Sequence, residues 1–194
     1  MYGYDEGVLH ARLGQLDRTQ KTVFAAACAQ RAEPLFRRFV ETSGLGDVDI
    51  LHSVLENVWT VAAGDPLDLH EDQRRAEDQV PIEDDSWIIE SGYGQNAAAC
   101  TAYAVRTWLT DDPQEAVWAA RQIYEVADYA AQNADASIDL NDLAVESRLL
   151  ATAIVQSALR GIDDDLGRAE SDLDILALRD IAMREGLEWS LSFP

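Results

Sequence analysis

The sequence predicts an all-α fold, a single-domain bundle of about seven to nine helices with no significant β-sheet. Apolar residues repeat at helical spacing, as Ile50, Val54 and Val58 do. Val, Ile and Thr do not gather into alternating runs, and the Asn-Gly and Asp-Gly pairs that favour β-hairpins are absent from the sequence. The segments between the helical patterns are short, as in helix bundles. We therefore expect one domain over residues 1–194.

Acidic residues mark the predicted helix starts, because a carboxylate accepts hydrogen bonds from the unpaired N–H groups of a first turn. Asp17 precedes Gln20 by the spacing of a capping box. Two Asp-Pro pairs place a carboxylate before Pro at the first helical position. The expected caps are Asp17, Asp47, Asp65, Asp112 and Asp139. Helix ends are expected at Gly44-Leu45-Gly46, at Gly64 and at Gly161.

These signals place the helices in order along the chain. The predicted helices span residues 5–15, 18–31, 34–43, 47–63, 66–79, 95–109, 113–133, 140–160 and 165–186, with a break at Pro34. In the last of them, Leu166, Leu173 and Leu176 form an apolar stripe that is expected to pack. Residues 80–94 are expected to be an irregular connecting segment, since they combine Pro81, three consecutive acids and two glycines.

The charge of the chain is strongly negative and unevenly distributed. It has 36 Asp and Glu residues against 15 Lys and Arg, a formal net charge of -21 at pH 7. Six of the bases lie in residues 12–40, whereas nearly all the acids lie after residue 40. A field of this sign repels nucleic acid and anionic membranes and favours a basic protein partner.

The sequence also predicts a cellular location and the state of the cysteines. The opening MYGYDEGV has neither the basic nor the apolar region of a secretory signal. No apolar run approaches the ~18 residues of a membrane helix. We therefore expect a cytoplasmic protein. Cys28 and Cys100 lie in Ala-rich apolar runs and are expected to be buried free thiols.

The motif search assigns no catalytic, cofactor-binding or metal-binding residues. A di-iron bundle needs two Glu-x-x-His motifs, and Asp49-Ile-Leu-His52 is the single acid-x-x-His match. His52 is interpreted as a surface or interhelical side chain that pairs with Glu56 one turn later. The pairs Glu125-x-x-Asp128 and Glu185-x-x-Glu188 have the wrong order and separation for the Mg²⁺ site of an all-α phosphohydrolase.

The most specific pattern is RLGQLDRTQKTVFAAACAQRAEPLFRRFVETSGLGDVDILHSVLENVW, at residues 12–59. Its pieces are Arg12-Leu13 with Leu16, the QKTVFAAACAQR helix, Pro34 followed by Phe36 and Phe39, the Ser43–Asp47 turn, and the helix that ends in Trp59. This segment resembles the opening of the YjaG-like family of bacterial proteins, a domain of unknown function (DUF416). The resemblance continues more loosely through Pro81, Asp84-Asp85 and Ala97–Cys100, and it lies mainly in residues 12–110. It implies an all-α bundle and carries over no reaction and no catalytic residues.

The leading hypothesis is a non-enzymatic interaction protein that has a basic protein partner and no cofactor. An immunity or antitoxin-type inhibitor of a basic toxin or nuclease is one alternative, and a carboxylate-metal-dependent hydrolase is another. The acidic surface expected to bind the partner consists of Asp139, Asp142, Glu146, Asp163, Asp164, Asp165, Glu170 and Asp172. If the chain forms a homo-oligomer, self-association is expected to use Arg31, Arg37 and Arg38.

Overall fold

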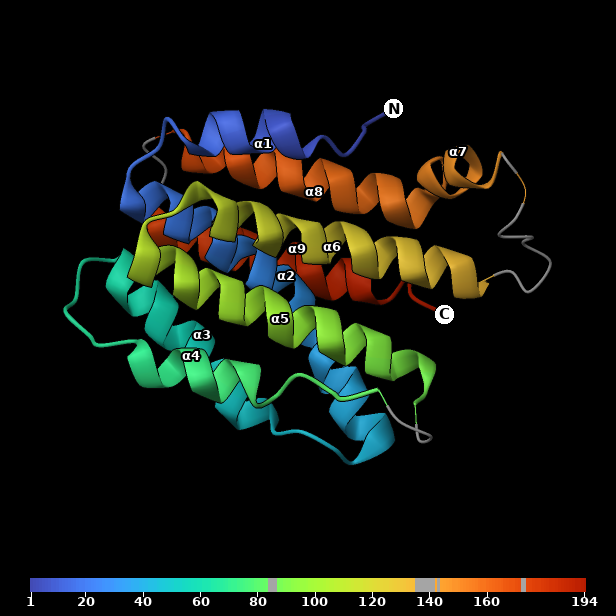
Figure 1. Ribbon diagram of the computed structural model, residues 1–194, viewed down its shortest axis with the longest axis horizontal. Helices are drawn as coiled ribbons and strands as arrows, with labels where there is room; N and C mark the ends of the chain where they lie inside the picture. Colours follow the sequence, from blue (N-terminus) through green and yellow to red (C-terminus); the bar gives the residue numbers. More distant parts are fainter. Residues whose placement is uncertain (84–86, 135–141, 143, 172–173) are drawn as a thin grey trace.

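The structure, a computed structural model, describes residues 1–83, 87–134, 142, 144–171 and 174–194. Within these residues it contains nine α-helices and no strand, which confirms the predicted all-α fold (Figure 1). The helices are α1 (Glu6–Leu13), α2 (Arg18–Ser43), α3 (Val48–Ala62), α4 (His70–Glu77), α5 (Ile89–Thr110), α6 (Pro113–Ala134), α7 (Val145–Leu150), α8 (Ala153–Ala169) and α9 (Ile175–Ser190). Buried apolar side chains from all of them form one hydrophobic core, as expected of a single domain.

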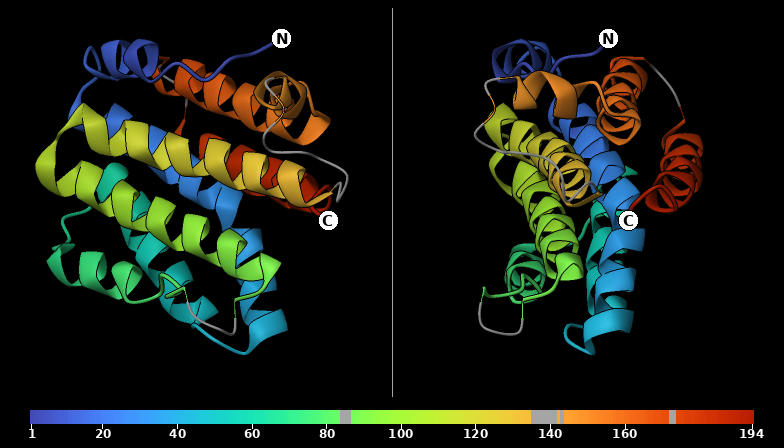
Figure 2. Two further views of the ribbon diagram at one scale, coloured as in Figure 1. Left: turned by 45° about the vertical axis from the view of Figure 1, so that its right-hand side comes forward. Right: turned by 90° about the vertical axis from the view of Figure 1, so that its right-hand side faces the viewer.

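The long helix α2 lies at the centre of the bundle. It packs against α3, α5, α6, α8 and α9. Figure 2 shows it between the α5–α6 pair on one side and α8 and α9 on the other. Because neighbours surround it, every residue from 21 to 32 of α2 is buried, including the polar Lys21, Gln30 and Arg31. These polar groups must therefore find partners inside the chain.

Helix α2 runs without interruption through Pro34, so the predicted break at this residue is wrong. A proline inside a helix removes one backbone hydrogen bond and costs about 3 kcal/mol or more. The neighbouring Leu35, Phe36 and Phe39 are buried, and full burial of each such side chain contributes about 1.5–3 kcal/mol. Their packing outweighs the cost of Pro34 and joins the two predicted helices into one.

Helix α5 begins at Ile89, so the second part of the predicted irregular segment 80–94 is helical. Gly92 and Gly94 lie inside this helix and serve as contact points. A Cβ atom at Gly92 would lie 2.5 Å from the ring of Tyr129, and one at Gly94 would lie 2.5 Å from the ring of Phe39. The glycines let α5 approach its neighbours closely, which explains why a helical segment has the composition of a loop.

The caps predicted at Asp17 and Asp47 are confirmed. Asp17 forms a reciprocal capping box with Gln20 at the start of α2. Asp47 accepts hydrogen bonds from the backbone N–H groups of Asp49 and Ile50 at the start of α3. Local sequence therefore predicts these two helix starts correctly.

The two Asp-Pro pairs behave differently from each other. Asp112 accepts a hydrogen bond from the backbone N–H of Gln114 at 2.9 Å, at the start of α6. Asp65 does not cap a helix, because the chain continues without regular structure until α4 begins at His70. The cap predicted at Asp139 lies outside the described residues.

The C-terminal third differs most from the predicted elements. The described part of the predicted helix 140–160 contains α7 and the first part of α8, which meet at residues 151–152. Gly161 lies inside α8, so the helix end predicted there is wrong. The last helix begins after the capping residue Asp174, and its Leu176 is exposed although it was expected to pack.

Both cysteines are buried free thiols, as predicted. The Cys100 thiol donates to the backbone carbonyl of Ala119 at 3.3 Å. Burial raises the pKa of both Cys28 and Cys100, because a thiolate is poorly stabilised away from water. None of the described helices combines the length and the apolar character needed to cross a membrane.

Candidate functional site

Part of the predicted acidic surface is neutralised by the chain itself. Arg12 of α1 pairs with Asp163 at 2.9 Å and with Glu170 at 2.8 Å, which ties α1 to α8. The hydrogen bond from Arg12 lowers the pKa of Glu170. Asp142 pairs with Arg148 at 3.1 Å. These acids present less net charge to a partner than the sequence alone suggests.

Two other acids of the predicted surface remain available. Asp164 on α8 and Glu146 on α7 are exposed, and within the described residues neither forms an ion pair. Asp139 and Asp172 lie outside the described residues. Among the described acids of the predicted surface, Asp164 and Glu146 are therefore the exposed ones that have no ion pair.

Arg31 and Asp165 are buried, so neither lies on the surface where the sequence places it. The Arg31 guanidinium donates through Nε and Nη2 to Asp165 and through Nη2 also to Glu185. Arg168 donates to the same two carboxylates, to Asp165 at 2.9 Å and to Glu185 at 3.3 Å. Burial alone would lower the pKa of Arg31, but the hydrogen bonds and charges of Asp165 and Glu185 outweigh it and raise the pKa. This network of two arginines and two carboxylates joins α2, α8 and α9, and its formal charges sum to zero.

The other two arginines of the predicted self-association surface have different environments. Arg38 pairs with Glu90 at 3.2 Å, donates to the backbone carbonyl of Phe193 at 3.3 Å and lies over the ring of Tyr93. It therefore holds the C-terminus against α2. Arg37 is exposed and lies 3.7 Å from Glu33 on the next turn of the helix.

Nearly all the positive charge of the chain is matched by its own acids. Within the described residues, every Lys and Arg except Arg160 and Arg184 forms an ion pair with Asp or Glu. The excess of acids is therefore not compensated at the surface. A basic partner would meet a surface that has few free bases to repel it.

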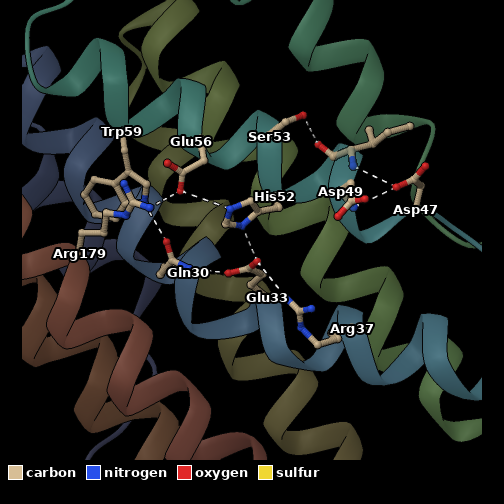
Figure 3. Close-up of polar contacts among 11 residues, drawn as sticks. Gln30, Glu33, Arg37, Asp47, Asp49, His52, Ser53, Glu56, Trp59 and Arg179 are labelled. Atoms are coloured by element: carbon tan, nitrogen blue, oxygen red, sulfur yellow. Dashed lines mark hydrogen bonds and ion pairs between the residues drawn. The ribbon is translucent and has the colours of Figure 1, made fainter.

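A polar cluster on α2, α3 and α9 surrounds His52 (Figure 3). Nδ1 of His52 lies 2.8 Å from Oε1 of Glu33, and Nε2 lies 3.8 Å from Oε1 of Glu56. Glu56 in turn pairs with Arg179 of α9. The expected pairing of His52 with Glu56 is therefore present as a long contact, and the shorter contact is with Glu33.

Glu33 is held in place from the core side of the same cluster. Gln30 donates to Oε2 of Glu33 at 2.6 Å, and the indole N–H of Trp59 donates to Oε1 of Gln30 at 3.0 Å. Gln30 and Trp59 are buried, so their geometry is fixed by packing. This chain of hydrogen bonds runs from Trp59 through Gln30 and Glu33 to His52 and fixes the positions of the polar groups on this part of the surface (Figure 3).

Exposed apolar side chains run along α9 beside this cluster. Leu176, Met183, Leu187 and the following Leu191 are 62%, 49%, 58% and 80% exposed. Their spacings of seven, four and four residues place them on one side of the helix. A groove of about 300 Å³ separates this stripe from α2 and α3. Its lining includes Glu33, Arg37, Arg38, Glu41, His52, Met183 and Leu187. The two arginines are paired with Glu33 and Glu90. We call this stripe and the groove together the α9 face.

The α9 face was missed at the level of sequence, although its signal is visible there. Met183, Leu187 and Leu191 continue the helical spacing that begins at Leu176. A stripe of this kind normally marks the buried side of a helix. In α9 the buried side is formed by Leu178, Ala182, Gly186 and Trp189, so the stripe on the other side of the helix faces solvent.

A metal site receives no support from the described residues. Within them, no group of three or more His, Cys, Asp or Glu side chains is arranged to hold a metal ion. In the two carboxylate pairs whose order and separation do not fit a Mg²⁺ site, Glu125 forms an ion pair with Arg121, and Glu185 forms one with Arg31. The carboxylate-metal hydrolase hypothesis therefore lacks a ligand set in this part of the chain.

Comparison with known proteins gives a family and a fold. The family model described as "Protein of unknown function (DUF416)" matches residues 8–187. Among solved structures, the crystal structure of a DUF416 family protein from Shewanella baltica OS155 is similar, with a TM-score of 0.77 and 20% sequence identity. The match covers 92% of this chain and 93% of that one. Comparison with curated proteins finds no match.

Proposed function

The chain belongs to the DUF416 family of proteins of unknown function, and we propose that it is an interaction module that binds a basic, partly apolar segment of a partner protein through the α9 face. The observation that carries this proposal is the row of exposed apolar residues on α9, Leu176, Met183, Leu187 and Leu191. Isolated exposed apolar residues are common, but several of them on one side of a helix, beside a groove, are typical of an interaction surface. Covering such side chains releases water and stabilises a complex.

The charge of the chain favours a basic partner over a second copy of itself. A second copy would bring a second formal net charge of -21 into the complex. On the α9 face, Glu41 forms no ion pair within the described residues, and neither does the exposed Asp180 of α9. A segment that carries Lys or Arg beside apolar residues would match both features. An immunity or antitoxin-type inhibitor of a basic nuclease is one role in which a protein with this surface would act.

The proposal is tested with a synthetic amphipathic helix that has leucines on one side and lysines on the other. Its affinity for the protein is measured by fluorescence anisotropy, together with a peptide in which glutamate replaces every lysine. We expect the lysine peptide to bind, the glutamate peptide not to bind, and the affinity to fall between about 50 and 200 mM salt.

Matched variants distinguish binding of the peptide at the α9 face from its general electrostatic attraction to an acidic protein. The double substitution Met183→Ser and Leu187→Ser removes two half-exposed apolar side chains, worth about 2 kcal/mol when a partner covers them. We therefore expect a roughly 30-fold loss of affinity. Val8→Ser on α1 removes an apolar side chain of similar exposure, 54%, and is expected to leave the affinity unchanged. Equal loss in both variants, or no loss in either, would contradict the proposal.

A further inference from the structure

A second cavity lies between α8 and α9, on the other side of α9 from the α9 face. Its volume is about 480 Å³, within the range of sites for small metabolites. Residues of α8 and α9 form its walls, and Arg31 of α2 reaches it from the core. The lining residues that matter here are Arg31, Ile154, Arg160, Asp164, Glu188 and Trp189.

Arg31 brings an unused hydrogen-bond donor to this cavity. Its side chain is only 6% exposed. Nε and Nη2 are occupied by Asp165 and Glu185, whereas Nη1 donates no hydrogen bond to any described residue. Arg31 and Gly161 both line the cavity, and a Cβ atom at Gly161 would lie 3.4 Å from Nη1, so the cavity is the route by which a ligand can reach this donor. A ligand oxygen that accepted from Nη1 would satisfy a nearly buried charged donor.

The donor is also held in a fixed position. A Cβ atom at Gly161 would lie 3.2 Å from Cζ of Arg31, so the backbone of α8 lies directly against the guanidinium. On the opposite side, a Cβ atom at Gly186 would lie 2.6 Å from the Cα atom of Arg31. Two carboxylates orient the group between these helices. A ligand that bound here would not need to order the arginine, and this lowers the entropic cost of binding.

The mouth of the cavity carries a different charge from its floor. The network at the floor is neutral, because Arg31 and Arg168 balance Asp165 and Glu185. At the mouth, Asp164, Glu188 and Arg160 are exposed and form no ion pair within the described residues. Two acids against one base leave a net negative charge there, which favours an ammonium group.

From these features we propose that the α8–α9 cavity binds a small α-amino acyl compound, an amino acid or its amide with an apolar side chain. Its acyl oxygen accepts a hydrogen bond from Nη1 of Arg31, its ammonium group lies near Glu188 and Asp164, and its side chain packs against Ile154 and Trp189. A simple anion fits less well, because the mouth and the whole chain are negative. This site is separate from the α9 face and does not depend on the function proposed for that face.

The test uses L-leucinamide and two analogues that each lack one recognised group. Isoamylamine keeps the ammonium group and the side chain but has no acyl oxygen, whereas N-acetyl-L-leucinamide keeps the acyl oxygen but has no ammonium group. Affinities are measured by calorimetry on the intact protein. We expect L-leucinamide to bind and both analogues to bind at least about tenfold more weakly, the loss that one charged or hydrogen-bonded contact causes.

Variants of exposed residues locate the site without disturbing the buried network, whereas an Arg31 variant would leave the buried Asp165 without its partner and destabilise the fold. Glu188→Gln is expected to weaken L-leucinamide at least about tenfold, and Ser157→Trp, which fills the cavity from the exposed side of α8, is expected to abolish binding. Glu77→Gln, the same change at an exposed glutamate of α4 that does not line the cavity, is the matched control and should bind like the original protein. The proposal is overturned if L-leucinamide does not bind, if either analogue binds equally well, or if Glu188→Gln and Glu77→Gln have the same effect.

Discussion

Replacing Gly186 with alanine is expected to destabilise the protein, because α9 touches the backbone of α2 at this residue. The added Cβ atom would lie 2.6 Å from Cα and 2.9 Å from the carbonyl oxygen of Arg31. These are backbone atoms of the central helix and cannot rotate away. Relief requires α9 to move away by roughly 1 Å, and overpacking of this kind costs about 1–3 kcal/mol. Such a shift would also disturb the contact between the adjacent Glu185 and Arg31.

A second glycine variant isolates the clash from the intrinsic preference of alanine for helices. Gly167 lies in α8 with no neighbouring atom within 4 Å of an added Cβ. Both substitutions gain up to about 1 kcal/mol of helix propensity. The difference between Gly186→Ala and Gly167→Ala therefore measures the clash, about 1–3 kcal/mol, or roughly 2–12 °C in Tm for a chain of this size.

The two glycine variants are compared by urea and thermal unfolding, followed by far-ultraviolet circular dichroism. Gly167→Ala is expected to be as stable as the original protein or more so, and Gly186→Ala less stable. Equal stability of the two variants would refute the close approach of α9 to α2. A loss of stability in Gly167→Ala alone would refute the described environment of both glycines.

Two further predictions concern the folded core. Asp17→Ala removes the capping box of α2 and is expected to lower the free energy of unfolding, measured by urea denaturation, by about 1 kcal/mol. Asp65→Ala removes no cap and should change this free energy by less than about 0.5 kcal/mol. Equal effects of the two substitutions would contradict the cap assignment. Because burial raises the pKa of Cys28 and Cys100, the folded protein keeps both thiols protonated above pH ~8.5, where the unfolded chain loses its protons. The free energy of unfolding should then fall by up to about 1.4 kcal/mol per thiol for each further pH unit, and replacing both cysteines with alanine should remove that part of the slope; an unchanged slope would place the thiols in contact with water.

Local sequence signals predicted the elements whose ends depend on neighbouring residues. The capping box at Asp17 and the cap at Asp47 are satisfied by backbone groups a few residues away. The fold class follows from the same local patterns, since helical spacing and the absence of hairpin turns need no tertiary information. These features were therefore predictable in physical terms.

The wrong predictions depend on contacts between distant segments. Gly94 and Gly161 are typical of turns, yet each lies in a helix where another helix presses against it, Phe39 in one case and Arg31 in the other. Pro34 is kept inside α2 by the buried side chains that follow it. No local pattern shows which distant residue will lie opposite a glycine or a proline.

The candidate sites were only partly predictable for a similar reason. The sequence showed that acids exceed bases, but not that Arg12 would neutralise Asp163 and Glu170, or that Arg31 would be buried against Asp165. Nor could it show which side of α9 would face solvent, because large apolar residues normally mark the buried side. The charge balance was predictable, whereas its distribution required the structure.

The most direct test of the proposed function is carbene footprinting of the protein with and without the bound lysine peptide. Labelling is read at Met183, Leu187 and Leu191 on the α9 face, and at two exposed apolar residues elsewhere, Val8 and Ile82. The α9-face interaction predicts that the peptide protects the three α9-face residues and leaves Val8 and Ile82 labelled. Binding of the peptide without protection of Leu187, or with equal protection of Val8 and Ile82, would contradict it.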